Sequence, residues 1–246
     1  MTPSELEEGS EKSAVHFGLM VRRGAKYGLR IRRDTYASIS KVSSHWFPRQ
    51  QDVARWEAES EIFEDADHKI YTDVWCELHQ KDALENFDLN MERFEALSAR
   101  EFDLALEMVV LSYPKMQEVI DLNDWVDGSV VYIMVLDQFK QAYVGIARSA
   151  GGMKKRIRQH WSSNKQFDRL LHGPVNESKI SIDSFRALDT TQIFAMRIKS
   201  PEAMENQILE SFPSKFVLNR IAGGTPQNSN ELRWLENLKF LNDFLP

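Results

Sequence analysis

Residues 130–136, Val-Val-Tyr-Ile-Met-Val-Leu, form an unbroken apolar run. The run is too short for a globular helix and is rich in β-branched side chains, so it predicts a strand buried on both faces. Residues 137–140 are polar and turn-like, and residues 142–147 predict a second short strand. The pattern therefore indicates a β-hairpin with strands near 130–136 and 141–147.

Two tyrosines are expected to meet on this hairpin. If Asp137 and Gln138 form the centre of the turn, Tyr132 and Tyr143 are direct cross-strand partners on one face of the sheet. Tyrosine pairs on strands often serve packing alone, so the pair by itself indicates no chemistry.

A helix is predicted after the loop formed by residues 149–152. Its apolar ridge has the spacing i, i+4, i+8: Met153, Ile157 and Trp161. Arg156 and His160 are also four residues apart, so they lie one turn apart beside that ridge. The two tyrosines, the arginine and the histidine can therefore converge on one small surface.

The next segments predict a third strand over 190–198 and a helix that begins with Ser200 as N-cap and Pro201 as its first residue. Glu205 lies on the apolar side of this helix, because the residues at i+3, i+4 and i+7 are Ile208, Leu209 and Phe212. An ionised carboxylate there is costly unless a cation or a strong donor meets it. Glu205 is therefore either a metal ligand or the partner of an arginine at the edge of the core.

This ordered set of residues resembles the GIY-YIG nuclease superfamily. Tyr132, in Val-Val-Tyr, matches the tyrosine that ends the first family motif, and Tyr143-Val144-Gly145 matches the second motif. Arg156, with His160 four residues later, matches the helical motif. The resemblance covers residues 128–224, and the Gly-Ile pair of the first motif is Val130-Val131 here.

Two further positions follow in family order. Glu205, in Glu-Ala-Met-Glu-Asn-Gln-Ile-Leu, matches the metal-binding glutamate of a later helix, and Asn219, in Val-Leu-Asn, matches a downstream asparagine. The resemblance implies an α+β fold with a small three-stranded, mainly antiparallel sheet flanked by helices. We expect a mixed, mostly helical region before it.

The resemblance also implies a metal-dependent DNA endonuclease that hydrolyses phosphodiester bonds. Its general base is Tyr132 or Tyr143, with Tyr132 preferred; its pKa is expected to be lowered by a nearby cation or metal, and His160 helps to remove the phenol proton. Arg156 would clamp the scissile phosphate with a bidentate, always charged guanidinium. Glu205 would hold Mg²⁺ or Mn²⁺ with phosphate oxygens and waters.

Positive charge is concentrated in the same part of the chain. The whole chain has a net charge of −6, but residues 127–223 hold 14 Lys and Arg against 9 Asp and Glu. A basic region beside an acidic one is compatible with binding of phosphate on one face only. The candidate DNA-binding cations lie on the polar side of the motif helix and on a further helix predicted over 164–172: Lys154, Lys155, Arg158, Lys165 and Arg169.

The sequence predicts four regions. Residues 1–13 resemble a disordered tail, residues 14–125 an N-terminal domain that selects the target, residues 126–224 the nuclease domain, and residues 225–246 a C-terminal helix packed on it. A hairpin over 17–21 and 27–31 is also plausible. Ser98 and Glu101 form a capping-box pattern that predicts a helix through residue 111.

Several classes of function find no support in the sequence. There is no apolar segment of membrane-spanning length, no signal-peptide pattern, no Cys/His cluster of zinc spacing and no sign of an organic cofactor. The single cysteine, Cys76, is compatible with a cytoplasmic protein. Two alternatives stay open: a non-catalytic nucleic-acid-binding or regulatory protein on the same scaffold, and an RNA-cleaving nuclease. A restriction, repair or toxin role and the oligomeric state are also left open.

Overall fold

The chain forms two compact units, each built from several segments. The computed structural model describes residues 17–18, 28–43, 57, 60–148, 151–162, 175 and 178–219. The first unit, here called the sheet unit, comprises Met1–Ile31, Met91–Lys165 and Ser181–Thr225, and the second, the helical unit, comprises Arg32–Asn90, Gln166–Ile180 and Pro226–Pro246. Residues 91–125, which the sequence analysis assigned to the N-terminal domain, thus belong with the sheet.

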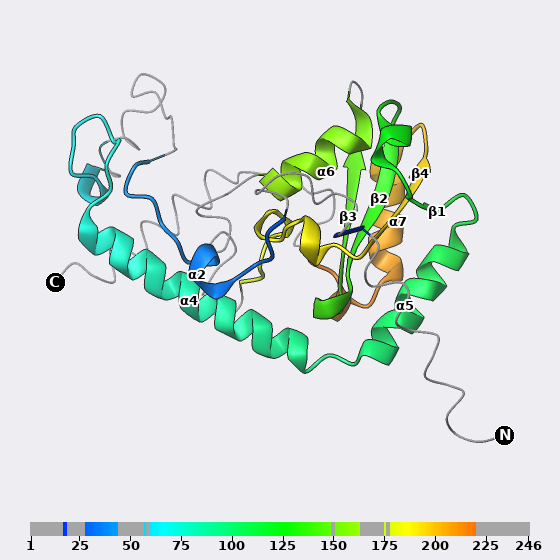
Figure 1. Cartoon of the computed structure of the whole chain (residues 1–246), viewed down its shortest axis with the longest axis horizontal. Helices are drawn as coiled ribbons and strands as arrows, with labels where there is room; N and C mark the ends of the chain where they lie inside the picture. Colours follow the sequence, from blue (N-terminus) through cyan, green and yellow to red (C-terminus); the bar gives the residue numbers. More distant parts are fainter. Residues whose placement is uncertain are drawn as a thin grey trace. The chain divides into compact units, whose positions relative to one another are not determined.

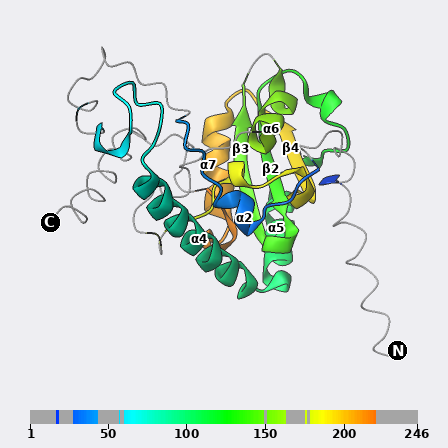
Figure 2. The same ribbon diagram turned by 60° about the vertical axis from the view of Figure 1, so that its left-hand side comes forward.

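The sheet unit contains a four-stranded antiparallel sheet with the strand order β1-β4-β2-β3. The predicted strands are confirmed as β2 (Val130–Leu136), β3 (Gln141–Ala147) and β4 (Gln192–Arg197), and Figure 2 shows these three side by side. The predicted α+β class is confirmed, but a sheet of three strands was wrong. The fourth strand, β1 (Gln117–Glu118), has only two residues, both polar and exposed, so no hydrophobic pattern marks it.

The turn between β2 and β3 is longer than predicted. Leu136 pairs with Gln141, so four residues form the loop instead of a two-residue turn. They include the 3₁₀ turn η4 (Asp137–Phe139) and Lys140, whose φ of 49° lies in the left-handed region. Tyr132 therefore faces Gly145 rather than Tyr143. The shift is two residues, and because strand side chains alternate with a period of two, both tyrosines stay on one face.

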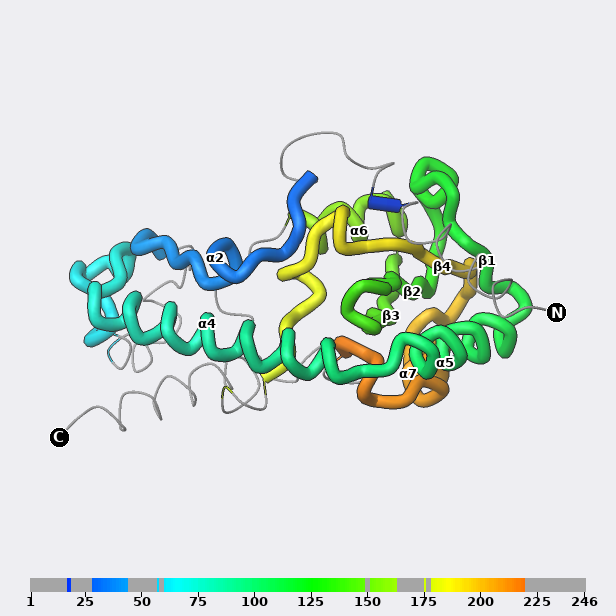
Figure 3. Tube along the Cα trace, turned by 60° about the horizontal axis from the view of Figure 1, so that its bottom comes forward, coloured from blue at the N-terminus to red at the C-terminus, as the bar shows by residue number. Residues whose placement is uncertain are grey.

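Helices cover both faces of the sheet, as the apolar run of β2 predicts. All seven residues of β2 are buried. On one face its Val131, Ile133 and Val135 share a core with residues of α5 (Ala99–Ser112) and α7 (Pro201–Ser211). On the other face lies α6 (Gly152–Ser162), the predicted motif helix. Figure 3 shows α6 on one side of β2 and β3, with α5 and α7 on the other.

Two predicted helix starts are confirmed only in part. Ser98 caps α5, because its hydroxyl accepts a hydrogen bond from the backbone N–H of Glu101 at 3.3 Å. The Glu101 side chain does not complete the capping box but forms an ion pair with Lys215. Pro201 is the first residue of α7 as predicted, but the Ser200 side chain makes no capping hydrogen bond. The ψ of 79° at Ser200 lies outside the extended region that capping residues adopt.

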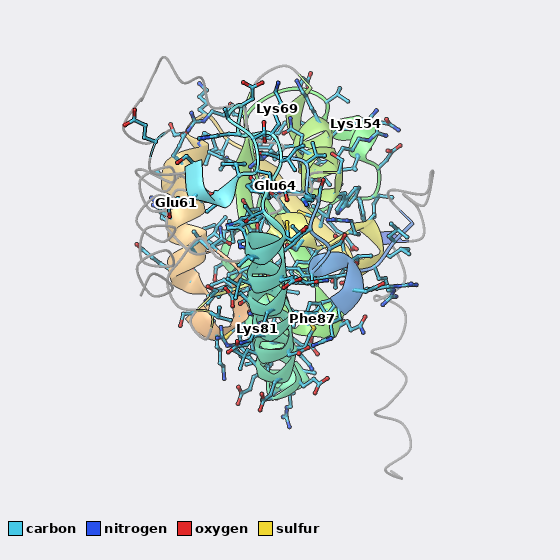
Figure 4. The ribbon with its side chains drawn as sticks, turned by 90° about the vertical axis from the view of Figure 1, so that its left-hand side faces the viewer. Glu61, Glu64, Lys69, Lys81, Phe87 and Lys154 are labelled. Atoms are coloured by element: carbon cyan, nitrogen blue, oxygen red, sulfur yellow. The ribbon has the colours of Figure 1, made fainter. Side chains whose placement is uncertain are left out.

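The helical unit contains α2 (Arg33–Tyr36), η2 (Ser60–Ile62) and α4 (Asp73–Glu95), whose last turn belongs to the sheet unit. Aromatic side chains form its core. The rings of Tyr71 and Trp75 stack with 4.0 Å between centroids, and Tyr36 packs on Phe87 at 5.5 Å. Figures 1 and 4 show the long α4, along which Figure 4 labels Phe87.

Some predictions fall outside the described residues: the helix over 164–172, the C-terminal helix in 225–246 and the tail 1–13. Of the hairpin predicted over 17–21 and 27–31, the structure describes only residues 17–18 and 28–31, and none of these residues forms a strand. Instead, the backbone N–H of Ile31 donates to Asp189 at 2.9 Å. None of the helices within the described ranges, including the 23 residues of α4, has the length and apolar character needed to cross a membrane.

Asp189 gives the sheet unit a pH-dependent contribution to stability. Burial raises its pKa from 3.8 to about 6, although the backbone N–H groups of Arg186 and Ile31 donate to its carboxylate and oppose the shift. Since the folded pKa is the higher one, this group stabilises the fold below about pH 3.8 and loses that contribution as the pH rises through about 6. The full difference is about 3 kcal/mol.

We therefore expect Asp189→Asn to flatten the pH dependence of the unfolding free energy between about pH 4 and 6. The asparagine oxygen can still accept both backbone hydrogen bonds, but the side chain no longer ionises. Urea unfolding of the parent and the variant at a series of pH values measures the effect. Asp137→Asn is the control, and equal pH slopes for Asp189→Asn and the parent would contradict the prediction.

Candidate active site

The two tyrosines and the histidine predicted to converge lie together on the α6 face of the sheet. The ring centroids of Tyr132 and Tyr143 are 6.4 Å apart, and that of His160 lies 6.3 Å from Tyr132 and 5.2 Å from Tyr143. Tyr132 and His160 are buried and Tyr143 is half-buried. The expected proximity is thus confirmed, although the tyrosines are diagonal rather than direct cross-strand neighbours.

Gly145 provides the space in which the two rings lie. A Cβ atom at this position would be 2.6 Å from the Tyr132 hydroxyl oxygen and 2.8 Å from Cε1 of Tyr143. Because Gly145 is the direct partner of Tyr132, the phenol ring of Tyr132 crosses the strand over the glycine backbone. The lack of a side chain at Gly145, the glycine of the Tyr-Val-Gly motif, therefore leaves room for the two tyrosine rings.

We expect Gly145→Ala to displace both rings and to destabilise the fold by about 1–3 kcal/mol, the usual cost of forcing an extra methyl group into a packed core. Urea unfolding measures the stability, and near-ultraviolet circular dichroism reports the surroundings of the tyrosines. A variant with parental stability and an unchanged tyrosine signal would show that the rings do not need this space.

A chain of hydrogen bonds runs behind the tyrosine pair. The Tyr132 hydroxyl is 2.9 Å from His160 Nε2, and His160 Nδ1 is 2.6 Å from Oδ1 of Asp183. Asp183 lies in the 3₁₀ turn η7 (Ile182–Ser184) and is 7% exposed. The sequence analysis did not identify Asp183, because no local spacing connects it to a histidine 23 residues earlier.

Both tyrosines have a raised pKa in the chain by itself. Burial is the main cause for each: it raises the pKa of Tyr143 to about 12 and that of Tyr132 well above its usual value of 10. The nearby charge of Arg156 opposes both shifts but does not outweigh burial. In the chain by itself, both phenols are therefore protonated near neutral pH, and ionisation of either one needs a proton acceptor or further positive charge.

Arg156 provides the positive charge of the site. It lies on α6 one turn before His160, and its side chain is accessible to solvent, as a phosphate clamp requires. Burial alone would lower its pKa, but the neighbouring Tyr132, Tyr143 and Asp183 raise it, so the guanidinium stays charged. Its surroundings therefore place a permanent cation beside both phenol groups.

Glu205 is a buried carboxylate, one oxygen of which, Oε2, has no hydrogen-bond partner among the described residues. Its side chain lies on α7 as predicted and is 2% exposed. The predicted alternative, an ion pair between Glu205 and an arginine, is absent within the described residues, since Arg148 instead pairs with the neighbouring Glu202. Burial and the charge of Glu202 raise the pKa of Glu205, while Arg148 and Arg156 oppose the shift.

A divalent cation fits this environment. A buried carboxylate oxygen with no donor gains most from a cation, because its desolvation is otherwise uncompensated. The described residues contain no group of three or more His, Cys, Asp or Glu side chains that could enclose a metal. An ion at Glu205 would therefore take its other ligands from substrate phosphate and water, which is the coordination Mg²⁺ prefers.

The structure brings Asn219 to β3 rather than to the phenol hydroxyls. Its side chain bonds to both backbone groups of Val144: Oδ1 accepts from N–H at 2.9 Å, and Nδ2 donates to the carbonyl at 2.7 Å. Asn219 thus fixes the strand residue between Tyr143 and Gly145. This contact supports a positioning role rather than the predicted catalytic one.

Three of the five candidate DNA-binding cations are described. Lys155 and Arg158 are exposed on α6, and Lys154 donates to Asn123 at 2.5 Å. Figure 4 labels Lys154 in the sheet unit. Lys165 and Arg169 lie outside the described residues.

A cavity of about 940 Å³ lies elsewhere in the sheet unit. It is bounded by the end of α5, the end of β4 and the first turns of α7, with Lys115, Arg197 and Lys199 among its lining residues. None of the candidate catalytic residues lines it, so the cavity is separate from the tyrosine pair.

Comparison with known proteins adds no relative to this geometry. No protein-family model matches the chain, and no curated protein or solved structure matches it. The assignment of a function therefore depends on the site itself.

Proposed function

We propose that the chain is a metal-dependent DNA endonuclease of the GIY-YIG type, which hydrolyses phosphodiester bonds. One observation carries the proposal: the buried carboxylate of Glu205, whose Oε2 atom has no hydrogen-bond partner among the described residues, interacts electrostatically with Arg156 and Tyr132. A protein core rarely keeps such a carboxylate without a compensating ligand. Its position beside a permanent cation and two phenols matches the needs of phosphate chemistry.

Each residue would have a separate task. The guanidinium of Arg156 binds the scissile phosphate and stabilises the charge that develops on its oxygens. Tyr132 accepts a proton from the attacking water, and His160 removes the phenol proton that its raised pKa otherwise retains. Tyr143 and Gly145 shape the site, and Asn219 holds the strand that carries them.

Glu205 would hold a Mg²⁺ or Mn²⁺ ion, which when bound supplies positive charge to the phosphate and the leaving oxygen. The N-terminal region, residues 14–125, is proposed to select the DNA target. We place the protein in the cytoplasm.

The experiment is incubation of the full chain with supercoiled plasmid, linear duplex, branched DNA and single-stranded RNA, with and without Mg²⁺. We expect cleavage of DNA that depends on Mg²⁺. Cleavage of RNA alone would replace DNA with RNA as the substrate, and binding without cleavage of any nucleic acid would indicate a non-catalytic scaffold. A Tyr132→Phe variant, which lacks the hydroxyl but keeps the ring, controls for a contaminating nuclease.

The polar side of α6 is expected to contact the DNA backbone. Combined replacement of Lys154, Lys155 and Arg158 with alanine should weaken DNA binding and reduce the slope of log affinity against log salt by up to about 3, because each phosphate contact releases about one counterion. Fluorescence anisotropy at several salt concentrations measures both quantities.

The control for this variant is Arg100→Ala. Arg100 is exposed on α5, the helix that covers the opposite face of the sheet. We expect its replacement to change neither affinity nor salt slope. If the triple variant behaves like this control, α6 does not face the DNA backbone.

A further inference from the structure

His160 lies between a phenol and a carboxylate in a closed environment. Tyr132, His160 and Asp183 are 0%, 1% and 7% exposed, so water does not separate them. A carboxylate only accepts hydrogen bonds, so Nδ1 of the imidazole carries the hydrogen that bonds to Asp183. In the neutral ring, Nε2 then has the lone pair, and it accepts the hydrogen bond of the Tyr132 hydroxyl.

We propose that Asp183 is a positioning residue that holds His160 in the tautomer able to accept the phenol proton of Tyr132, which makes Tyr132 rather than Tyr143 the general base. The proposal rests on the proposed nuclease function and deepens it. No residue of the family motifs corresponds to Asp183, which enters the site only through the fold.

Asp183 is itself held in place by its own turn. Its backbone N–H donates to the Ser181 hydroxyl at 3.3 Å, and its carbonyl accepts from Nη1 of Arg186 at 2.6 Å. Because η7 packs against α6, these contacts fix the carboxylate at one edge of the imidazole. A rigid partner of this kind selects one ring orientation and one tautomer.

The proton path then involves four groups. The hydroxyl proton of Tyr132 moves to His160 Nε2, and the phenolate takes a proton from the attacking water. The water oxygen forms its bond to phosphorus as the bond from phosphorus to the 3′ oxygen breaks. Solvent protonates the leaving 3′ oxygen, and His160 returns its extra proton to solvent.

Titratable groups on several elements act on this path, some favouring it and some opposing it. Asp183 stabilises the imidazolium that forms, and Arg156, on the same helix, favours the phenolate. Within the described part of the chain, Tyr143 from β3 and Glu205 from α7 are further titratable groups near the phenol of Tyr132, and both disfavour its ionisation. The 3₁₀ turn η3 (Leu122–Trp125) also packs on α6, and it carries the exposed acid Asp124. A variant of Asp124 therefore serves as a matched control.

The test is Asp183→Asn in the full chain, with Asp124→Asn as the control. Asparagine keeps the size and the acceptor oxygen of aspartate but removes the charge. We expect the titration midpoint of His160, followed by ¹⁵N NMR and assigned with His160→Gln, to fall by about one pH unit or more. We also expect kcat for DNA cleavage with Mg²⁺ to fall about 10²-fold with KM nearly unchanged, and the acid limb of the pH profile to move to lower pH.

The outcomes separate this proposal from the function on which it rests. An active parent whose Asp183→Asn variant keeps the parental His160 midpoint, kcat and pH profile would overturn the role of Asp183 alone. A parent that cleaves no nucleic acid would overturn the proposed function and, with it, the catalytic role of the relay. Tyr143→Phe should retain most of the activity that Tyr132→Phe loses, and the reverse result would overturn the choice of base.

Discussion

Glu205→Gln is expected to abolish cleavage while it leaves the fold intact. The glutamine keeps the size and one acceptor oxygen of the side chain but removes the charge that would hold a divalent cation. Loss of that charge stabilisation corresponds to several kcal/mol, so we expect the cleavage rate to fall at least about 10³-fold. Isothermal calorimetry with Mg²⁺ should show loss of metal binding in the same variant.

The same substitution should stabilise the fold at higher pH. Burial raises the pKa of Glu205, so in the parent this group contributes stability below the pKa of an unfolded glutamate and loses that contribution as the pH rises through the folded value. Glutamine does not ionise, so the variant should gain stability relative to the parent as the pH rises over that window. Urea unfolding at pH values below and above it measures the difference.

Glu202→Gln is the matched control. Glu202 lies on the same helix, but its side chain is 47% exposed and pairs with Arg148. We expect its replacement to leave cleavage and metal binding nearly unchanged. If Glu205→Gln cleaves DNA and binds Mg²⁺ like this control, the metal assignment is wrong and the proposed function loses the observation that carries it.

The main strands could be predicted because their burial is visible as runs of apolar residues in the sequence. An apolar run buried on both faces, such as 130–136, has no other stable place than the middle of a sheet. The exposed residues of β1 carry no such pattern, and the left-handed conformation of Lys140 has no signal, since glycine or asparagine usually marks it. The number of strands and the turn length therefore followed only from the structure.

Residues of the candidate site could be predicted where their position follows from the local periodicity of a helix or strand. Residues that reach the site only through tertiary packing could not be predicted. The i, i+4 spacing of Arg156 and His160 and the apolar face around Glu205 are local properties. Asp183 belongs to a short turn whose contact with His160 depends on the fold. The sequence names the cation that lowers the pKa of both tyrosines but not the depth of burial, which raises it by more in the chain by itself.

Arg156→Ala should also abolish cleavage, by about 10²–10³-fold or more, because the phosphate loses the donors that stabilise its developing charge. The cause differs from that of the glutamate variant, so calorimetry should still detect Mg²⁺ binding. The salt slope of DNA binding should fall by about 1, since one phosphate contact is lost. Loss of metal binding in Arg156→Ala would mean that the arginine acts through Glu205 rather than on the substrate.

Two further variants separate the charge of Arg156 from its geometry. Arg156→Lys keeps the positive charge but lacks the planar fork that binds two phosphate oxygens at once. We therefore expect the lysine variant to recover DNA binding and its salt slope, while cleavage stays at least about tenfold below the parent. Arg100→Ala removes an exposed arginine from α5, on the opposite face of the sheet, and should leave the cleavage rate nearly unchanged. Full activity of Arg156→Lys would show that a point charge is sufficient. The proposed bidentate binding of phosphate by Arg156 would then be wrong.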